Sequence, residues 1–145
     1  MKKTIVIGVV SALFSSLTFA TACPDTPAVL ADVAAAAITV EACVCGGSTA
    51  GKTNYAGGSG AVVASPIFVK NGFIVQCSSN TYVSVNEVST TGFAVAAGSI
   101  KGNQTVAGSS NGGAVSVSGQ CAATGCTPAN VTTANGVAST AASGS

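Results

Sequence analysis

Apolar and polar positions alternate in short segments along the second half of the chain, and glycine, asparagine and serine separate these segments. In residues 81–88, Val83 and Val85 fall on one face and more polar side chains fall on the other. This period of two is typical of a half-buried β-strand. Two further segments, 92–100 and 112–119, also predict short strands. We therefore expect this part of the chain to form a sheet.

The stretch "PIFVKNGFIVQC" predicts a β-hairpin. Two apolar runs flank Asn71-Gly72, a dipeptide whose residues both tolerate the positive φ angles of a type I′ turn. Strands are expected at 66–70 and 73–77. Together with the alternating segments, this hairpin defines an expected β-rich domain over residues 61–126.

A helical period precedes this region. Over residues 29–40 the apolar positions are spaced i, i+1, i+4, i+7, i+8 and i+11, which is the stripe of an amphipathic helix. Asp25 or Thr26 can cap this helix, and Pro27 can occupy its first turn. We expect residues 23–45 to form an N-terminal arm and a helix that covers one face of the sheet. The alternative is a helix that docks on a neighbouring subunit.

Two segments carry no apolar period. Residues 46–60 are rich in glycine and are expected to form a loop, and residues 127–145 are expected to form a flexible C-terminal tail. The predicted fold class is therefore mainly β with one N-terminal amphipathic helix. The fold is expected to be a small α+β or β-sandwich-like domain that disulfides staple together.

Residues 1–22 have the order of a secretory signal peptide, with two lysines, an apolar run and then small residues. Cleavage after Ala20 leaves Thr21 as the first residue, whereas cleavage after Ala22 leaves Cys23. An N-terminal cysteine raises the alternative of lipidation, which would attach the protein to a membrane. Lipoprotein signals usually have a large aliphatic residue at the place of Ala20, so we expect an unlipidated protein that is secreted or located at the cell surface.

Six cysteines suit an oxidising destination, because an even number can pair completely in disulfides. They are Cys23, Cys43, Cys45, Cys77, Cys121 and Cys126. The sequence alone does not sort their pairing. If residue 44 and its neighbours are extended, Cys43 and Cys45 share a face and should bond to other cysteines. Cys23 is expected to form an internal staple, and the alternative is a crosslink to a neighbouring subunit.

Composition narrows the function classes. After residue 22 the chain has four carboxylates and three lysines, with no arginine, histidine or tryptophan, so it lacks the basic patch that nucleic acid requires. The hydrophobic content of 48% comes mostly from alanine and valine, whose small side chains give a modest core. Such domains usually rely on disulfides or on assembly with their own copies. No metal site is expected, because the cysteine spacing lacks the C-x2-C pairs of zinc sites.

The stretch "GGSTAGKT" matches the phosphate-loop pattern through Gly46, Gly51, Lys52 and Thr53. A working phosphate loop needs a helix directly after it and an acidic residue on a later strand to hold magnesium. Glycine and serine follow here, and no aspartate occurs after Asp32. We treat the match as chance and expect no cofactor. The absence of histidine and of closely paired carboxylates also argues against an enzyme.

These observations favour an exported structural protein that assembles with its own copies into a bacterial surface fibre, a pilus-like filament or an extracellular matrix. In composition the chain resembles bacterial fimbrial and matrix subunits, because it combines a signal peptide and cysteines with few charges and many small residues. It lacks the specific motifs of type IV pilins, curli and chaperone–usher subunits. The alternative is a small secreted or surface-anchored module that binds a carbohydrate or a protein through the loop from Lys52 to Tyr55.

Overall fold

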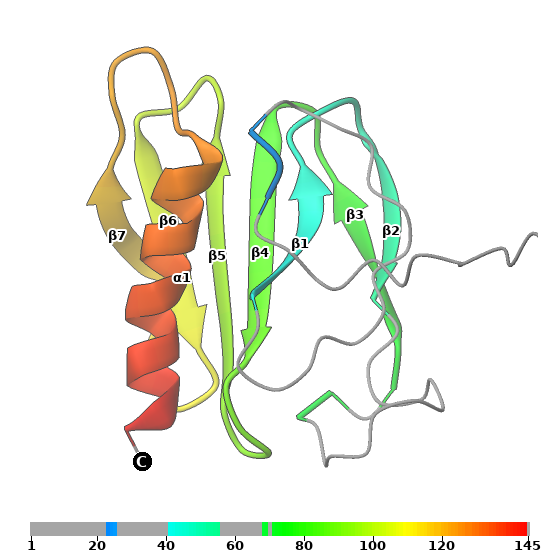
Figure 1. Ribbon diagram of the computed structural model, residues 1–145, viewed down its shortest axis with the longest axis vertical. Helices are drawn as coiled ribbons and strands as arrows, with labels where there is room; N and C mark the ends of the chain where they lie inside the picture. Colours follow the sequence, from blue (N-terminus) through cyan, green and yellow to red (C-terminus); the bar gives the residue numbers. More distant parts are fainter. Residues whose placement is uncertain (1–22, 26–40, 56–67, 70, 145) are drawn as a thin grey trace, which may run out of the picture.

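The structure is a computed structural model that describes residues 23–25, 41–55, 68–69 and 71–144. These residues form seven strands and one helix (Figure 1). The elements are β1 (Glu41–Gly46), β2 (Gly51–Tyr55), β3 (Phe73–Cys77), β4 (Thr81–Glu87), β5 (Phe93–Ser99), β6 (Gln104–Ser109), β7 (Ser116–Gln120) and α1 (Pro128–Ser143). Antiparallel strands β1, β4, β5, β6 and β7 form a five-stranded sheet in that order. Strands β2 and β3 form a separate two-stranded sheet.

Strand β4 is buried on both faces. Its Tyr82 and Ser84 side chains face α1, whereas Val85 and Glu87 face the two-stranded sheet. The molecule therefore has three layers, which are α1, the five-stranded sheet and the two-stranded sheet (Figure 1). Two buried clusters, one on each side of the five-stranded sheet, form the core. The alternating segments 81–88 and 92–100 correctly predict β4 and β5.

Helix α1 begins at a capping box. The Thr127 hydroxyl accepts a hydrogen bond from the Asn130 N–H, and the Asn130 side chain accepts one from the Thr127 N–H. Pro128 follows at the first helical turn, where its missing N–H leaves no hydrogen bond unmade. This short sequence signal explains where the helix starts.

Small side chains hold α1 against the sheet. Ala134, Ala138 and Ala142 recur once per turn and lie in one cluster with Ala94 and Ala96 of β5. Small residues on both surfaces allow a helix and a sheet to approach closely, so many weak contacts add up. The expectation of a flexible tail after residue 126 is wrong, because residues 128–143 form α1. The sequence pattern hides this helix, because its buried stripe consists mostly of alanine, which is only weakly apolar.

The predicted fold class places its helix at the wrong end of the chain. The only helix that the structure describes lies near the C-terminus, and not before the sheet. The segment 29–40, which carries the predicted N-terminal helix, lies outside the described residues. At the end of the same predicted region, residues 41–45 belong to β1, where they pair with β4. The supported fold class is mainly β with two antiparallel sheets, one C-terminal helix and three disulfides.

The predicted hairpin strand at 73–77 is β3, but its predicted partner is wrong. Phe68 and Val69, in the middle of the expected strand 66–70, are not in a strand. β3 pairs instead with β2, where Tyr55 lies opposite Phe73. A favourable turn dipeptide gives a hairpin only when both flanking segments also pack as strands.

Strand β2 lies inside the segment 46–60 that composition predicts to be a loop. Thr53 and Tyr55 of β2 are buried against the sheet, and Lys52 is exposed on the outer face. Although the stretch is rich in glycine, alternate side chains of β2 pack against the sheet, and this packing stabilises the strand. The loop prediction therefore holds at residues 47–50, and residues 56–60 lie outside the described residues.

Strand β1 contains a β-bulge at Val44. Cys43 lies opposite Ser84 and Cys45 lies opposite Val83, so β1 advances two residues while β4 advances one. The extra residue turns Cys43 toward α1 and Cys45 toward the two-stranded sheet. The expectation that both cysteines share a face is wrong, because it assumes a regular strand.

Candidate functional site

All six cysteines are paired within the chain. The bonds are Cys23–Cys43, Cys45–Cys77 and Cys121–Cys126, with Cα–Cα distances of 4.7, 5.5 and 5.0 Å. Three disulfides in one small chain indicate an oxidising, extracellular environment. Cys23 forms the internal staple, so its sulfur is not free to crosslink a neighbouring subunit in this structure.

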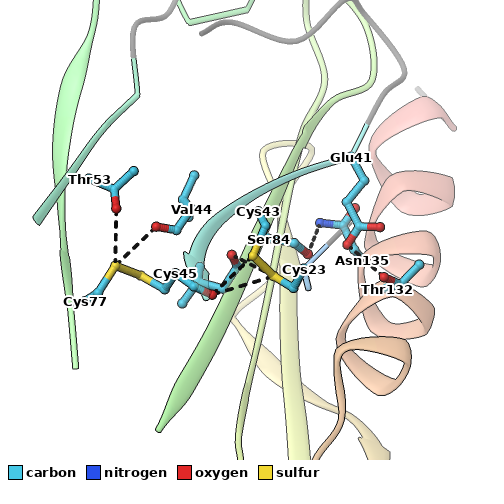
Figure 2. The surroundings of a disulfide bond; sticks show 11 residues. Cys23, Glu41, Cys43, Val44, Cys45, Thr53, Cys77, Ser84, Thr132 and Asn135 are labelled. Carbon is cyan, nitrogen blue, oxygen red and sulfur yellow. Dashed lines mark hydrogen bonds between the residues drawn. A yellow bond between two sulfur atoms is a disulfide. The ribbon is translucent and has the colours of Figure 1, made fainter. Parts of the chain in front are cut away.

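The bulge in β1 distributes two of these bonds over the two faces of the sheet (Figure 2). On one face Cys45–Cys77 joins β1 to β3, and the Cys77 sulfur lies 3.2 Å from the Val44 carbonyl oxygen. On the other face Cys23–Cys43 joins the start of the described chain to β1 beside α1. Because Cys45–Cys77 connects the two sheets, it fastens the β2–β3 layer to β1.

The phosphate-loop match has a geometry that does not suit a phosphate. Gly46 ends β1, a turn follows, and Gly51 begins β2. Lys52 is exposed, whereas Thr53 is buried on the opposite face of the strand. A phosphate site needs backbone N–H groups at a helix N-terminus together with the lysine and the threonine on one side. Strand β2 provides neither.

A buried carboxylate lies between the two sheets. The Glu87 side chain is 0% exposed, accepts a 2.6 Å hydrogen bond from the Tyr55 hydroxyl, and accepts a 3.1 Å bond from the Val69 N–H. Burial, and then the hydrogen bond and charge of Glu87, raise the pKa of Tyr55 above its ordinary value. Tyr55 is fully buried, so it is not the exposed contact residue that the binding-module alternative requires. We interpret this pair as a structural contact, because no substrate can reach it.

A chain of polar side chains aligns α1 on β4. The Asn135 amide donates to the Ser84 hydroxyl at 3.0 Å, and the Ser139 hydroxyl donates to the Asn135 carbonyl oxygen at 3.1 Å. The Asn86 amide then donates to Ser139 at 3.1 Å. Figure 2 shows Asn135 pointing from α1 to Ser84. These bonds fix the position of the helix along the strand, and among the described residues they leave the Asn86 side-chain oxygen buried without a partner.

The free edge of the five-stranded sheet is the most distinctive surface in the described part of the chain. Strand β7 is terminal in the sheet and pairs only with β6. Val115 and Val117 are 64% and 57% exposed. Val117 lies opposite the exposed Val106 of β6. Val115 approaches Gly108, which lies two residues after Val106 on β6. Val106, Val115 and Val117 therefore share the face away from α1, and we call them the valine patch.

The other face of β7 opens onto a groove. Helix α1 packs mainly over β4, β5 and β6, and the space beside it over β6 and β7 has a volume of 360 Å³. Ser116 and Ser118 line the groove from β7, and Val137 and Ala141 line it from α1. The Ser118 hydroxyl is buried there without a hydrogen-bond partner. Both faces of β7 are thus incompletely covered.

No charged residue occurs from residue 102 to the end of the chain. Strands β6 and β7 and helix α1 therefore contribute no ionisable side chain to the surface, and the Glu41 carboxylate of β1 meets α1 at Thr132. The apolar pattern does not predict this surface, because residues 127–145 show no apolar period and no alternating segment marks β6. The signal that identifies it is the position of the last charge, Lys101, together with the exposed valines.

A scan against protein-family models, a search of curated proteins and a search of solved structures each found no match to this chain. Among the described residues, no helix has the length and apolar character needed to cross a membrane. The same residues contain no cluster of three or more metal-ligating side chains. The function therefore has to be argued from the surface and the disulfides of the chain itself.

Proposed function

We propose that this protein is an exported, disulfide-stabilised structural subunit that assembles with its own copies, as in a bacterial surface fibre, a pilus-like filament or an extracellular matrix. The observation that carries the proposal is the uncharged surface of residues 102–144 with the free β7 edge at its margin.

The β7 edge lacks most of the features that keep soluble proteins apart. Edge strands of monomeric proteins usually carry lysine, proline or inward-pointing charges, because unpaired N–H and C=O groups attract other strands. Residues 115–120 contain none of these, and the valine patch adds exposed apolar area next to the edge. The Ser118 bulge is the one protective feature, and it lies toward the end of the strand. Low surface charge also weakens the repulsion between copies.

Export supports the same proposal. The leader-like residues 1–22 direct a chain to the outside, and three disulfides suit that destination. Lipidation would need the Cys23 sulfur, which here is bonded to Cys43. The unlipidated form is therefore favoured, and attachment to a surface would come from assembly.

The proposal is tested with the purified mature chain, starting at Cys23 and with its disulfides intact. Sedimentation velocity over a wide range of protein concentration should show reversible growth of oligomers, and electron microscopy of the extracellular fraction of the native host should show filaments or matrix that contain the protein. A chain that stays monomeric at the highest soluble concentration, and is monomeric in the native fraction, would reject self-assembly. Saturable binding of a carbohydrate or protein by that monomer would support the binding-module alternative.

A further inference from the structure

The two edges of the five-stranded sheet differ in their surroundings. At one edge β1 is followed by β3, which lies on the side of β1 away from β4 and is bonded to it through Cys45–Cys77 (Figure 1). At the other edge β7 has no neighbouring strand among the described residues. Of the two terminal strands, β7 is therefore the one that lies clear of the two-stranded sheet among the described residues.

We propose that β7 pairs antiparallel with β7 of a second copy, so that two five-stranded sheets join into one continuous sheet across a twofold axis. This inference rests on the proposed self-assembly and names the surface through which the first contact forms. Two identical edges that meet across a twofold axis give a closed, isologous interface. Growth beyond this dimer then needs a different surface.

The occupant of the β7 edge is identified by its chemistry. Unpaired backbone N–H and C=O groups are completed by another extended strand, and not by a small ligand. The adjoining surface has no charge from residue 102 onward, so it offers nothing to a nucleic acid or to an acidic or basic peptide. A second copy brings an equally neutral surface, which places no like charges against each other and leaves no charge buried without a partner.

The bulge in β7 sets the register. Thr105 pairs with Gly119 and Val106 pairs with Val117, so Ser118 is the extra residue that disrupts regular pairing. The regular part of the edge lies on the N-terminal side of the bulge. It consists of Ser116 and Val117 of β7 and the preceding Val115, which approaches Gly108 of β6, so it is centred on Ser116. Antiparallel pairing about that centre places Ser116 opposite the same residue of the second copy.

This register also explains the exposed valines. With Ser116 at the twofold axis, Val115 of each copy lies opposite Val117 of the other. Both side chains are on the face away from α1, so the valine patches of the two copies become one continuous apolar surface. Cross-strand pairs of β-branched residues stabilise antiparallel sheets. The pairing brings the two most exposed valines of the valine patch into cross-strand contact and satisfies the free backbone groups beside them.

Hydrogen–deuterium exchange on the full mature chain tests the pairing directly. Amides of residues 115–118 should become protected as the protein concentration rises through the association range. Val117→Lys should weaken association by roughly tenfold, because both Val115–Val117 pairs of the interface are lost. Ile74→Lys is the matched control, since Ile74 is 67% exposed on β3 and lies outside the β7 interface. Thermal unfolding of both variants checks that the monomer fold is kept.

The outcomes separate this inference from the proposed function. Association with concentration-dependent protection at 115–118 that Val117→Lys removes and Ile74→Lys keeps would support the β7 pairing. Association without that protection, or with equal effects of the two variants, would overturn the pairing and leave self-assembly standing. A monomer at all concentrations would overturn both.

As a second readout, Ser116→Cys should give a covalent dimer that retains the three native disulfides, whereas Gln120→Cys, far from the axis in this register, should not.

Discussion

Replacing Tyr55 by phenylalanine tests the interior between the two sheets. The substitution keeps the aromatic ring, which packs 5.4 Å from the Phe73 ring between centroids, and removes only the hydroxyl. That hydroxyl donates to a Glu87 carboxylate oxygen at 2.6 Å in a site where Glu87 is 0% exposed. Water cannot easily replace the lost donor there, so one carboxylate oxygen is left unpaired while the other keeps the Val69 N–H.

The expected loss follows from that geometry. A hydrogen bond to a charged group contributes about 1.5–3 kcal/mol to the free energy of unfolding, and a neutral one contributes about 1 kcal/mol. Tyr55→Phe should therefore lower the free energy of unfolding by about 2 kcal/mol, which corresponds to a fall of roughly 8 °C in Tm for a domain of this size. In a Glu87→Gln background the same change should lower it by only about 1 kcal/mol. The difference measures the charge-assisted part of the contact.

The pH dependence gives an independent check with a defined sign. Burial and Glu87 hold the pKa of Tyr55 above its ordinary value near 10, so the folded state favours the neutral phenol. This contribution to stability is complete below pH 10 and is lost as pH rises above it, at up to about 1.4 kcal/mol per pH unit. Burial also raises the pKa of Tyr82, with a smaller effect from Asp25. Tyr55→Phe should therefore reduce the alkaline slope without abolishing it.

The assay is reversible urea unfolding followed by circular dichroism, with disulfides intact, at neutral pH and at several alkaline values. Tyr82→Phe is the matched control, because it makes the same chemical change at a buried tyrosine whose hydroxyl does not bond to a carboxylate among the described residues. A free energy of unfolding for Tyr55→Phe within about 0.5 kcal/mol of wild type would refute the reasoning. An unchanged alkaline slope would refute the assignment of that slope to Tyr55.

Three further substitutions test the fold. At Gly125, φ is +115° and an added Cβ would lie 1.5 Å from the Ile100 carbonyl oxygen, so Gly125→Ala should lower the free energy of unfolding by at least about 3 kcal/mol. Gly136 lies in α1 with nothing near its Cβ position, so Gly136→Ala should instead raise it by about 1 kcal/mol. Replacing Cys45 and Cys77 together by alanine opens a loop with a sequence separation of 32 and should lower it by about 3–4 kcal/mol. Urea unfolding measures all three, and equal stability of the two glycine variants would contradict the geometry at both positions.

The strands that sequence predicts well are those whose alternation is driven by larger apolar side chains. β4 and β5 follow the segments 81–88 and 92–100 closely, and β3 begins and ends where its apolar run does. Local patterning is sufficient for β4 and β5 because each has a buried face regardless of which strand lies beside it. Local patterning does not predict which strand pairs with β3, because that depends on which segment packs beside it in the folded chain.

The elements that sequence misses depend on small residues or on a single irregularity. Helix α1 packs through alanine, which apolarity scales score weakly although it fits closely against the alanines of β5. The orientation of Cys43 and Cys45 depends on one extra residue, Val44, and no composition rule places a bulge. Predicting that β7 is an edge strand requires the order of strands in the sheet, which is known only once all the strands are placed. The position of the last charge, Lys101, is the only sequence signal that marks this surface in advance.

The contrast between the two sheet edges is the strongest argument for assembly. Evolution of a monomeric secreted protein would be expected to protect both edges, because either one can start aggregation. In this chain β1 is flanked by the two-stranded sheet and joined to it by a disulfide, whereas β7 carries no lysine or proline and lies beside exposed valines. An edge that is open among the described residues, beside a surface without charge, supports the proposal that a second molecule covers it.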